Sequence, residues 1–450
     1  MNQVGAVFER FRKARKDARE RAALDQLLDD ARQLMTERGE SNSIAIATRA
    51  LGHYRHLGAD AVQRFFEVLA SEYDPDPAEM LALAQQYAET RSPEALIALQ
   101  RVADPPRQAL LRRLNLAPGG TGTLVAMRAR LLERLKGDAS LKAVDADFQH
   151  LLSSWFNPGF LQLAEVDWNS PAQLLEKIIH HEAVHEIDGW ADLRRRLEPD
   201  RRCFAFFHPA LPDEPLIFVE VALLEEMPSA IAPLLDRKGE PQADADRFRV
   251  AAFYSISNCQ PGLRGVNLGN FLIKRVADRL KQQFPKLKTF CTLSPIPGFA
   301  GWLAKVETLE SSRLKPAAVA GLQAGLDELR ERYGKDWSLL ATPPEEGGAR
   351  TAEARRLDAD RQMLHRLCAF FLLHTAPGDA RGSDPVARFH LNNGARLERI
   401  NPAADLSRKG IRQSHGLMVN YLYDLDEIEA NHEKFVDGRV SASRAVLSMP

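Results

Sequence analysis

The sequence is poor in cysteine and has no long apolar run. Its four cysteines, Cys203, Cys259, Cys291 and Cys368, include no CxxC pair. This spacing argues against a zinc ribbon, an iron–sulfur site or a disulfide framework, and it favours buried thiols in a reducing compartment. No apolar run approaches the roughly 18 residues that a membrane span needs. The first residues have no signal-peptide core and include acidic side chains that are untypical of a transit peptide. We therefore expect a cytoplasmic protein that does not bind membranes.

The chain also has no excess of either charge. Its 60 Lys and Arg face 61 Asp and Glu, which gives a net charge of −1. This balance gives no electrostatic reason to expect a nucleic-acid partner. The 450 residues are 45% hydrophobic and 27% charged, an ordinary globular composition. That length allows two or three domains with a large core.

Helical periodicity dominates the first 150 residues. Apolar residues recur at spacings of three and four, as in AALDQLLDDARQLM. Breaks that contain proline or glycine, such as Pro105-Pro106, end one helix and begin the next. We predict an all-helical domain over residues 1–153, used for packing or oligomerisation, and a second domain over residues 154–450.

Short aromatic and β-branched runs characterise the second domain. The runs CFAFFHP, PLIFVEVALL, RVAAFYSIS and KTFCTLS predict strands, as do ARFHLNN, RLERI and GLMVNYLYDL near the end. Helices are predicted over about 171–197, with a break at Gly189, and over LGNFLIKRVADRLKQQF. A charged stretch at about 312–376 predicts a solvated helical insertion. Strands and helices mixed in this order indicate an α+β fold.

The segment from His181 to His185, HEAVH, matches the zinc-protease pattern HExxH. On a helix, two histidines four residues apart share a face and can ligate zinc, with the glutamate as general base. The extended pattern fails here, because Asp188 and Ala191 stand where it has Gly and His. We interpret the segment as polar residues on a helix face near a contact between domains or subunits. We expect no metal, and a zinc peptidase is kept as an alternative.

A glycine-containing loop separates the predicted strand RVAAFYSIS from the next helix. Backbone N–H groups at a helix start favour an anion, and glycine lets the backbone approach it closely. A plain strand-to-helix turn explains the glycines as well. The loop resembles the acyl-CoA pyrophosphate loop of GNAT-type acetyltransferases, Q/R-x-x-G-x-G/A. It would begin at Arg264 and end at Gly269, with Asn267 in place of the first glycine.

Longer blocks resemble the malonyl-CoA decarboxylase family. They are EAVHEIDGWADLRRRLEPDRRCFAFFHP, FYSISNCQPGLRGVNLGNFLIKRV, FPKLKTFCTLSPIPGFAGWL and PVARFHLNNGARLERINPAADLSRKGIRQSHGLMVNY. The resemblance covers nearly the whole chain and implies a helical N-terminal domain followed by a GNAT-like catalytic domain. It implies decarboxylation of malonyl-CoA to acetyl-CoA and carbon dioxide, without a cofactor or metal. It also implies a homo-oligomer, dimer or tetramer, that serves fatty acid or malonate metabolism.

The resemblance also indicates site residues. The serine of LSPIPGF and the histidine of FHLNNGA correspond to the family's catalytic pair, here Ser294 and His390. Tyr423 either lines the pocket or packs in the core. Mammalian relatives have Glu at the position of Asn267 and Tyr at that of His181, and the second difference speaks against metal ligation. The implied CoA-binding residues are Arg264, Gly265, Val266, Asn267, Leu268, Gly269 and Asn270.

The chemistry suits these residue types. Loss of carbon dioxide from a malonyl thioester leaves an enolate, and the thioester carbonyl is itself the electron sink. The protein has to orient the carboxylate, stabilise the enolate oxygen and deliver a proton to C2. We assign His390 as the proton donor and Ser294 as its hydroxyl partner and carboxylate contact. A GNAT acyltransferase acting on an amine and a non-catalytic, CoA-responsive assembly protein are the further alternatives.

Overall fold

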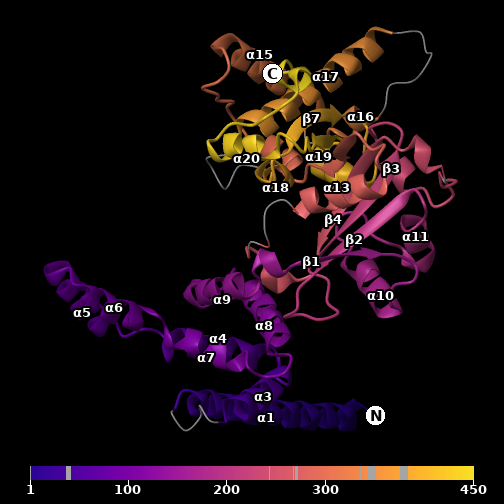
Figure 1. Cartoon of the computed structure of the whole chain (residues 1–450). Helices are drawn as coiled ribbons and strands as arrows, with labels where there is room; N and C mark the ends of the chain where they lie inside the picture. The colour runs from indigo at the N-terminus through magenta and orange to yellow at the C-terminus, as the bar shows by residue number, and fades with distance from the viewer. Residues whose placement is uncertain are drawn as a thin grey trace. The chain divides into compact units, whose positions relative to one another are not determined.

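The fold is known from a computed structural model (Figure 1). It describes residues 2–36, 42–242, 244–266, 268, 272–334, 336–342, 351–375 and 384–450. Within them, the chain divides into two compact units. The first comprises Met1–Gln162 with Phe207–Leu216 and Cys259–Leu268, and the second comprises Leu163–Phe206, Ile217–Asn258 and Gly269–Pro450.

The first unit is built from helices, as the apolar periodicity predicts. Several helices begin at the expected signals. Asp76 and Ser92 accept backbone N–H groups at the starts of α5 and α6, and a proline follows each of them. The helices are α1 (Asn2–Leu34), α3 (Ser43–Arg55), α4 (Ala59–Ser71), α5 (Pro77–Thr90), α6 (Pro93–Ala103), α7 (Pro106–Leu114), α8 (Gly120–Arg134) and α9 (Lys142–Trp155).

A mixed sheet forms the centre of the second unit, which confirms the predicted α+β class. The strands are β1 (Gln162–Val166), β2 (Arg201–Phe207), β3 (Ile217–Leu224), β4 (Val250–Asn258), β5 (Thr289–Thr292), β6 (Ser294–Pro295), β7 (Arg396–Asn401) and β8 (Met418–Leu422). Their order is β1-β2-β3-β4-β5-β8-β6, with β7 beside β8. β4 runs antiparallel to β3 and parallel to β5, and α13 (Leu272–Gln283) connects β4 to β5. The pairs that β8 makes with β5, β6 and β7 are antiparallel.

One predicted strand is a helix. The run ARFHLNN, which contains His390, lies in α18 (Pro385–Asn392). The Asp384 carboxylate accepts the backbone N–H groups of Val386 and Ala387, and Pro385 occupies the first helical turn. This start signal outweighs the apolar alternation that predicted a strand.

The predicted helix over 171–197 is interrupted earlier than expected. It consists of α10 (Ala172–His181) and α11 (Gly189–Arg196), and residues 182–188 are not helical. Glu182 ends α10 because its carboxylate accepts the backbone N–H groups of Val184 and His185. The two histidines of HEAVH therefore do not share a helix face, and the interpretation of this segment as a helix-face cluster was wrong.

The stretch at 312–376 contains three helices in its described part, but it is not simply solvated. It contains α15 (Pro316–Tyr333), α16 (Ser338–Ala341) and α17 (Ala352–His374). The second half of α17 is buried, including Leu367, Cys368 and Phe371. The remaining helices of the second unit are α12 (Ala232–Leu235), α14 (Phe299–Leu303), α19 (Arg408–Ser414), α20 (Ile428–Val436) and α21 (Arg444–Leu447).

Two expectations from composition can be checked directly. All four cysteines are free and buried, as their spacing predicts. Among the helices in the described part of the chain, none is both long and apolar enough to cross a bilayer.

Candidate active site

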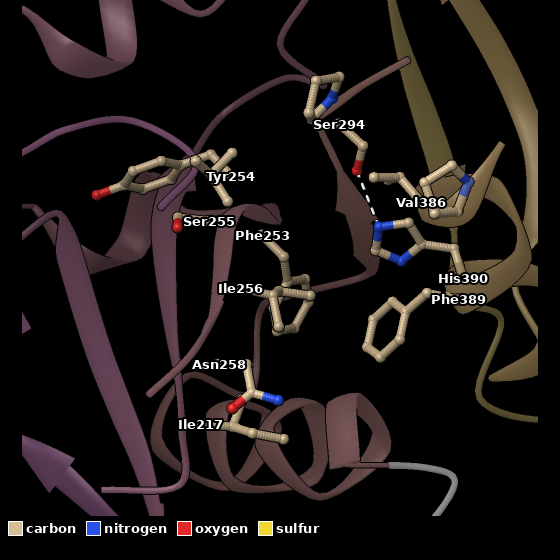
Figure 2. A pocket seen from close by; sticks show the side chains of 13 residues that line it. Ile217, Phe253, Tyr254, Ser255, Ile256, Asn258, Ser294, Val386, Phe389 and His390 are labelled. Carbon is tan, nitrogen blue, oxygen red and sulfur yellow. Dashed lines mark hydrogen bonds between the residues drawn. The ribbon is translucent and has the colours of Figure 1, made fainter. Parts of the chain in front are cut away.

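A cavity of about 300 Å³ opens in the second unit beside β4 and α18 (Figure 2). Most of its wall is apolar, and among the lining residues that the structure describes there is no lysine or arginine. The polar groups in its lining come from β4, from Ser294 at the start of β6 and from His390 of α18. The lining residues are Val184, Ile217, Phe253, Tyr254, Ser255, Ile256, Asn258, Ser294, Pro295, Pro385, Val386, Phe389 and His390.

A β-bulge shapes the β4 wall. Glu220 of β3 pairs with Ser255, but the next residue, Val221, pairs with Phe253, so Tyr254 is an extra residue in β4. A bulge locally redirects side chains. Figure 2 shows the Tyr254 phenol directed away from Ser294 and His390.

Ser294 follows a break in a strand. β5 and β6 share one register against β8, because Cys291 pairs with Leu422 and Ser294 pairs with Val419. Between them, the Thr292 hydroxyl accepts the Tyr421 N–H at 3.1 Å in place of a backbone carbonyl. The chain resumes pairing at Ser294, which is 5% exposed at the cavity wall.

His390 is held on three sides. Its Nε2 lies 3.0 Å from Ser294 Oγ, the dashed line in Figure 2, and its Nδ1 lies 2.8 Å from Tyr423 Oη. The imidazole also stacks on the Tyr421 ring, with ring centroids 4.7 Å apart. The pair that the sequence singled out, Ser294 and His390, is therefore in direct contact.

The hydrogen-bond pattern indicates the protonation state of this group. The Ser294 hydroxyl donates to Thr292 Oγ1 at 2.8 Å. All three contacts are satisfied when Tyr423 O–H donates to Nδ1 and the His390 Nε2–H donates to Ser294 Oγ. Burial lowers the pKa of His390 to about 3 and raises the pKa of Tyr423 well above its usual value. Both side chains are consequently uncharged at neutral pH.

Tyr423 does not line the cavity. It is buried, and its hydroxyl contacts the imidazole of His390 from behind the wall.

The described part of the loop predicted to bind CoA belongs to the first unit. Arg128 of α8 donates to the carbonyls of Gly262 and Arg264, at 2.8 Å each, and Gln149 of α9 donates to the Gly265 carbonyl. Gly265 has φ +79°, a backbone conformation that glycine adopts readily. The Arg264 side chain is exposed, whereas Val266 and Leu268 are buried. Asn267, Gly269 and Asn270 lie outside the described residues.

The HEAVH segment contributes to the cavity in another way. The Glu182 carboxylate accepts the hydroxyls of Ser255 and Ser257 in addition to its two backbone N–H groups. These contacts fix residue 184 in the cavity wall. Burial lowers the pKa of His185 to about 4. Among the described residues, no group of three or more His, Cys, Asp or Glu side chains could hold a metal ion.

Sequence reasoning missed Thr292 and Asp384. A signal existed for each: the T-x-S spacing in KTFCTLS puts two hydroxyls on one side of a strand, and Asp-Pro is a helix-start signal. The contact of each with a residue distant in the sequence could not be seen from that signal.

Comparison with known proteins gives a consistent result. The family model of the malonyl-CoA decarboxylase C-terminal domain matches residues 159–449, and that of the malonyl-CoA decarboxylase N-terminal domain matches residues 73–156. A protein from Anser anser anser named malonyl-CoA decarboxylase, mitochondrial, is 38% identical over 353 residues, covering 76% of this chain and 69% of the relative. The protein of the same name from Mus musculus is 37% identical over 378 residues, covering 79% of this chain and 74% of the relative.

Solved structures agree with this result. A crystal structure titled malonyl-CoA decarboxylase from Rhodopseudomonas palustris is 46% identical, with a TM-score of 0.81, and covers 94% of this chain and 98% of its own. Another, from Agrobacterium vitis, is 48% identical, with a TM-score of 0.79 and coverage of 94% and 99%.

Proposed function

This chain belongs to the malonyl-CoA decarboxylase family, and we propose that Ser294 and His390 carry out the decarboxylation of malonyl-CoA to acetyl-CoA and carbon dioxide. The observation that carries the proposal is the 3.0 Å contact between Ser294 Oγ and His390 Nε2 at the wall of a mainly apolar cavity. The reaction is that of a carboxy-lyase.

The apolar wall favours the first step, loss of carbon dioxide. A malonyl carboxylate concentrates its charge on two oxygens, whereas the enolate spreads it over carbon and the thioester oxygen. The side chains of Phe253, Ile256 and Val386 cannot replace the water around either anion. The desolvation cost is smaller for the enolate, because its charge is dispersed, so the apolar wall favours its formation. The thioester carbonyl accepts the electron pair, and the step needs no cofactor.

The pair serves the second step, protonation of C2. A thioester enolate is a strong base, so it can take its proton from a neutral group and no imidazolium is required. The Ser294 hydroxyl turns from Thr292 and gives its proton to C2 while its oxygen takes the Nε2 proton of His390, which leaves an imidazolate hydrogen-bonded to the Tyr423 O–H. Water then returns a proton to Nε2, and the hydroxide that remains combines with carbon dioxide as bicarbonate. Tyr423 is a positioning residue here, because its O–H on Nδ1 keeps the proton on Nε2.

The CoA end is assigned to the loop from Arg264 to Asn270. Exposed Arg264 offers a positive charge for a pyrophosphate. The contacts of the Arg264 and Gly265 carbonyls with Arg128 and Gln149 support this assignment, because they fix the backbone that carries the Arg264 side chain.

Assembly and compartment belong to the same proposal. We infer a homo-oligomer, dimer or tetramer, whose subunits meet through the helical unit, and a cytoplasmic enzyme of fatty acid or malonate metabolism. Four free, buried cysteines are consistent with a reducing compartment.

The test is direct. Purified protein is incubated with malonyl-CoA labelled at the free carboxylate, and labelled carbon dioxide and acetyl-CoA are followed together. We expect equal amounts of both, unchanged by a strong chelator or an added amine. Acylated amine in place of acetyl-CoA would indicate an acyltransferase. If the chelator removes both bound zinc and activity, the protein is a metal enzyme. Absence of any turnover would favour a CoA-responsive assembly protein.

A further inference from the structure

Asp384 joins the two segments that carry the reacting pair. One oxygen, Oδ1, accepts the backbone N–H groups of Val386 and Ala387 at 2.9 Å each, at the start of α18. The other, Oδ2, accepts the backbone N–H of Gly298 at 2.7 Å. Gly298 lies four residues after Ser294, and Asp384 lies six residues before His390. The carboxylate is 2% exposed.

These contacts close a ring around the site. From Asp384 the ring follows α18 to His390, crosses to Ser294, and returns through residues 295–298 to the Asp384 carboxylate. Both covalent parts are stiff: one is a helix, and the other contains Pro295 and Pro297, whose φ angles are fixed. A change at the carboxylate therefore moves Ser294 relative to His390.

We propose that Asp384 is a positioning residue, which sets the distance between Ser294 Oγ and His390 Nε2 by binding Gly298 and the first turn of α18 with one carboxylate. This inference rests on the proposed function of the pair. It assigns Asp384 a role beyond helix capping, because capping α18 requires only Oδ1, whereas Oδ2 binds the Gly298 N–H.

The glycine on the other side of this contact fits the same role. A Cβ on Gly298 would lie 3.1 Å from Asp384 Oδ2 and 3.4 Å from the Phe371 ring. A side chain there would press on the carboxylate that the Gly298 N–H binds. Gly301 lies in the short helix α14, which begins directly after Gly298, and a Cβ at Gly301 would meet no atom within 4 Å. The two glycines thus form a matched pair.

The decisive variant is Asp384→Asn. Asparagine caps helices about as well as aspartate, but it has only one acceptor oxygen. If the oxygen caps α18, the amide NH₂ faces the Gly298 N–H, donor against donor. If the amide turns round, the cap is lost. Either way one of the two connections breaks, while volume and burial hardly change.

We expect Asp384→Asn to lower kcat about ten-fold or more and to change the KM for malonyl-CoA less than two-fold. A displacement of about 1 Å can cost as much as 10²-fold in rate. The control is Asp76→Asn, because Asp76 caps α5 in the helical unit through Ala78 N; it should leave kcat unchanged. Gly298→Ala should resemble Asp384→Asn, and Gly301→Ala should resemble wild type.

A second measurement needs no turnover. The ¹⁵N signals of His390, identified by their loss in His390→Asn, report its hydrogen bonds in the resting protein. They should move towards those of a free imidazole in Asp384→Asn and Gly298→Ala, but not in the controls. Unchanged signals and kcat in folded Asp384→Asn, with only a lower Tm, would reduce Asp384 to a cap and overturn the proposal. If wild type fails to decarboxylate malonyl-CoA, the proposed function falls, and the ¹⁵N signals still decide the positioning role.

Discussion

At the scale of single residues, burial determines the form in which His390 acts. The imidazole is 3% exposed and lies against Tyr421 and Tyr423, with no acidic partner among the causes of its shifted pKa. Desolvation therefore disfavours the imidazolium. The sequence predicted His390 as the proton donor, and in the structure its imidazole is neutral, with a hydrogen-bond pattern that assigns the proton to Nε2.

The pair should behave as one unit. We expect His390→Asn and Ser294→Ala each to lower kcat by roughly 10²-fold or more, as the loss of an acid or a hydroxyl relay does. Because both act on the same proton, the double variant should be little worse than the poorer single variant. Steady-state kcat of all three checks this, with a CoA titration to show that binding persists. Additive losses would assign the two residues to different steps.

The pKa of His390 also predicts how pH acts on the protein. Its folded value, about 3, lies below the unfolded value of about 6.5. The unfolded chain therefore binds the extra proton first. Burying a neutral His390 therefore costs no stability above pH 6.5. As pH falls from 6.5 towards 3, the free energy of unfolding decreases, with a limiting slope of about 1.4 kcal/mol per pH unit.

Denaturant unfolding of wild type and His390→Asn at several pH values measures this pH dependence. The difference in unfolding free energy between them should shrink as pH falls from 6.5. In parallel, kcat should show no histidine titration between pH 6 and 8. A kcat that follows a group with a pKa near 6.5 would mean that His390 titrates in the complex.

At the scale of elements, the proposed reacting pair and the proposed CoA loop belong to different compact units. The pair lies on β6 and α18 of the second unit, whereas the described loop residues pack against α8 and α9 of the first. Arg128, 1% exposed, is the main anchor of the loop, with an ion pair to Asp145 besides its two carbonyl contacts. Binding of CoA and the chemistry at C2 should therefore respond to different substitutions.

Arg264→Ala tests this separation. Loss of one charge near the phosphates should raise the KM for malonyl-CoA several-fold, more at low salt than at high salt, because salt screens the attraction. The kcat should stay within two-fold. Lys136→Ala, an exposed cation of the same unit, is the control and should change neither constant. A fall in kcat without a change in KM would show that Arg264 does not bind the phosphates of CoA.

At the scale of the whole molecule, the helical unit leaves apolar side chains exposed. Leu81 of α5 and Ile97 of α6 are 60% and 49% exposed, and no residue of α5 is buried. Figure 1 shows α5 and α6 side by side as a pair. Exposed apolar residues on a paired helical element are typical of a subunit contact.

A charge at this position tests the homo-oligomer. Leu81→Lys should lower the molar mass measured by light scattering at a fixed protein concentration, since burying an ammonium in a contact is costly. Val436→Lys, at a site that is 68% exposed on α20 of the other unit, is the matched control and should keep the wild-type mass. The opposite pattern would place the subunit contact on the second unit.

The sequence by itself determined the class of the fold and indicated which two residues form the proposed pair. Apolar periodicity specified the helices of the first unit, β-branched runs specified most strands of the sheet, and the LSPIPGF and FHLNNGA blocks pointed to Ser294 and His390. These features depend on local propensity and on motifs that are contiguous in the chain, so they can be read from the order of the residues.

Only the tertiary structure decided how these parts act together. ARFHLNN forms a helix because the Asp384 carboxylate caps it, and HEAVH leaves its helix because Glu182 turns back onto its own backbone and onto β4. Ser294 and His390 are 96 positions apart in the sequence, and their side chains reach a 3.0 Å contact only when β6, β8 and α18 pack. The neutral state of His390 follows from the same packing, because desolvation depends on which side chains surround a group and not on its neighbours in the sequence.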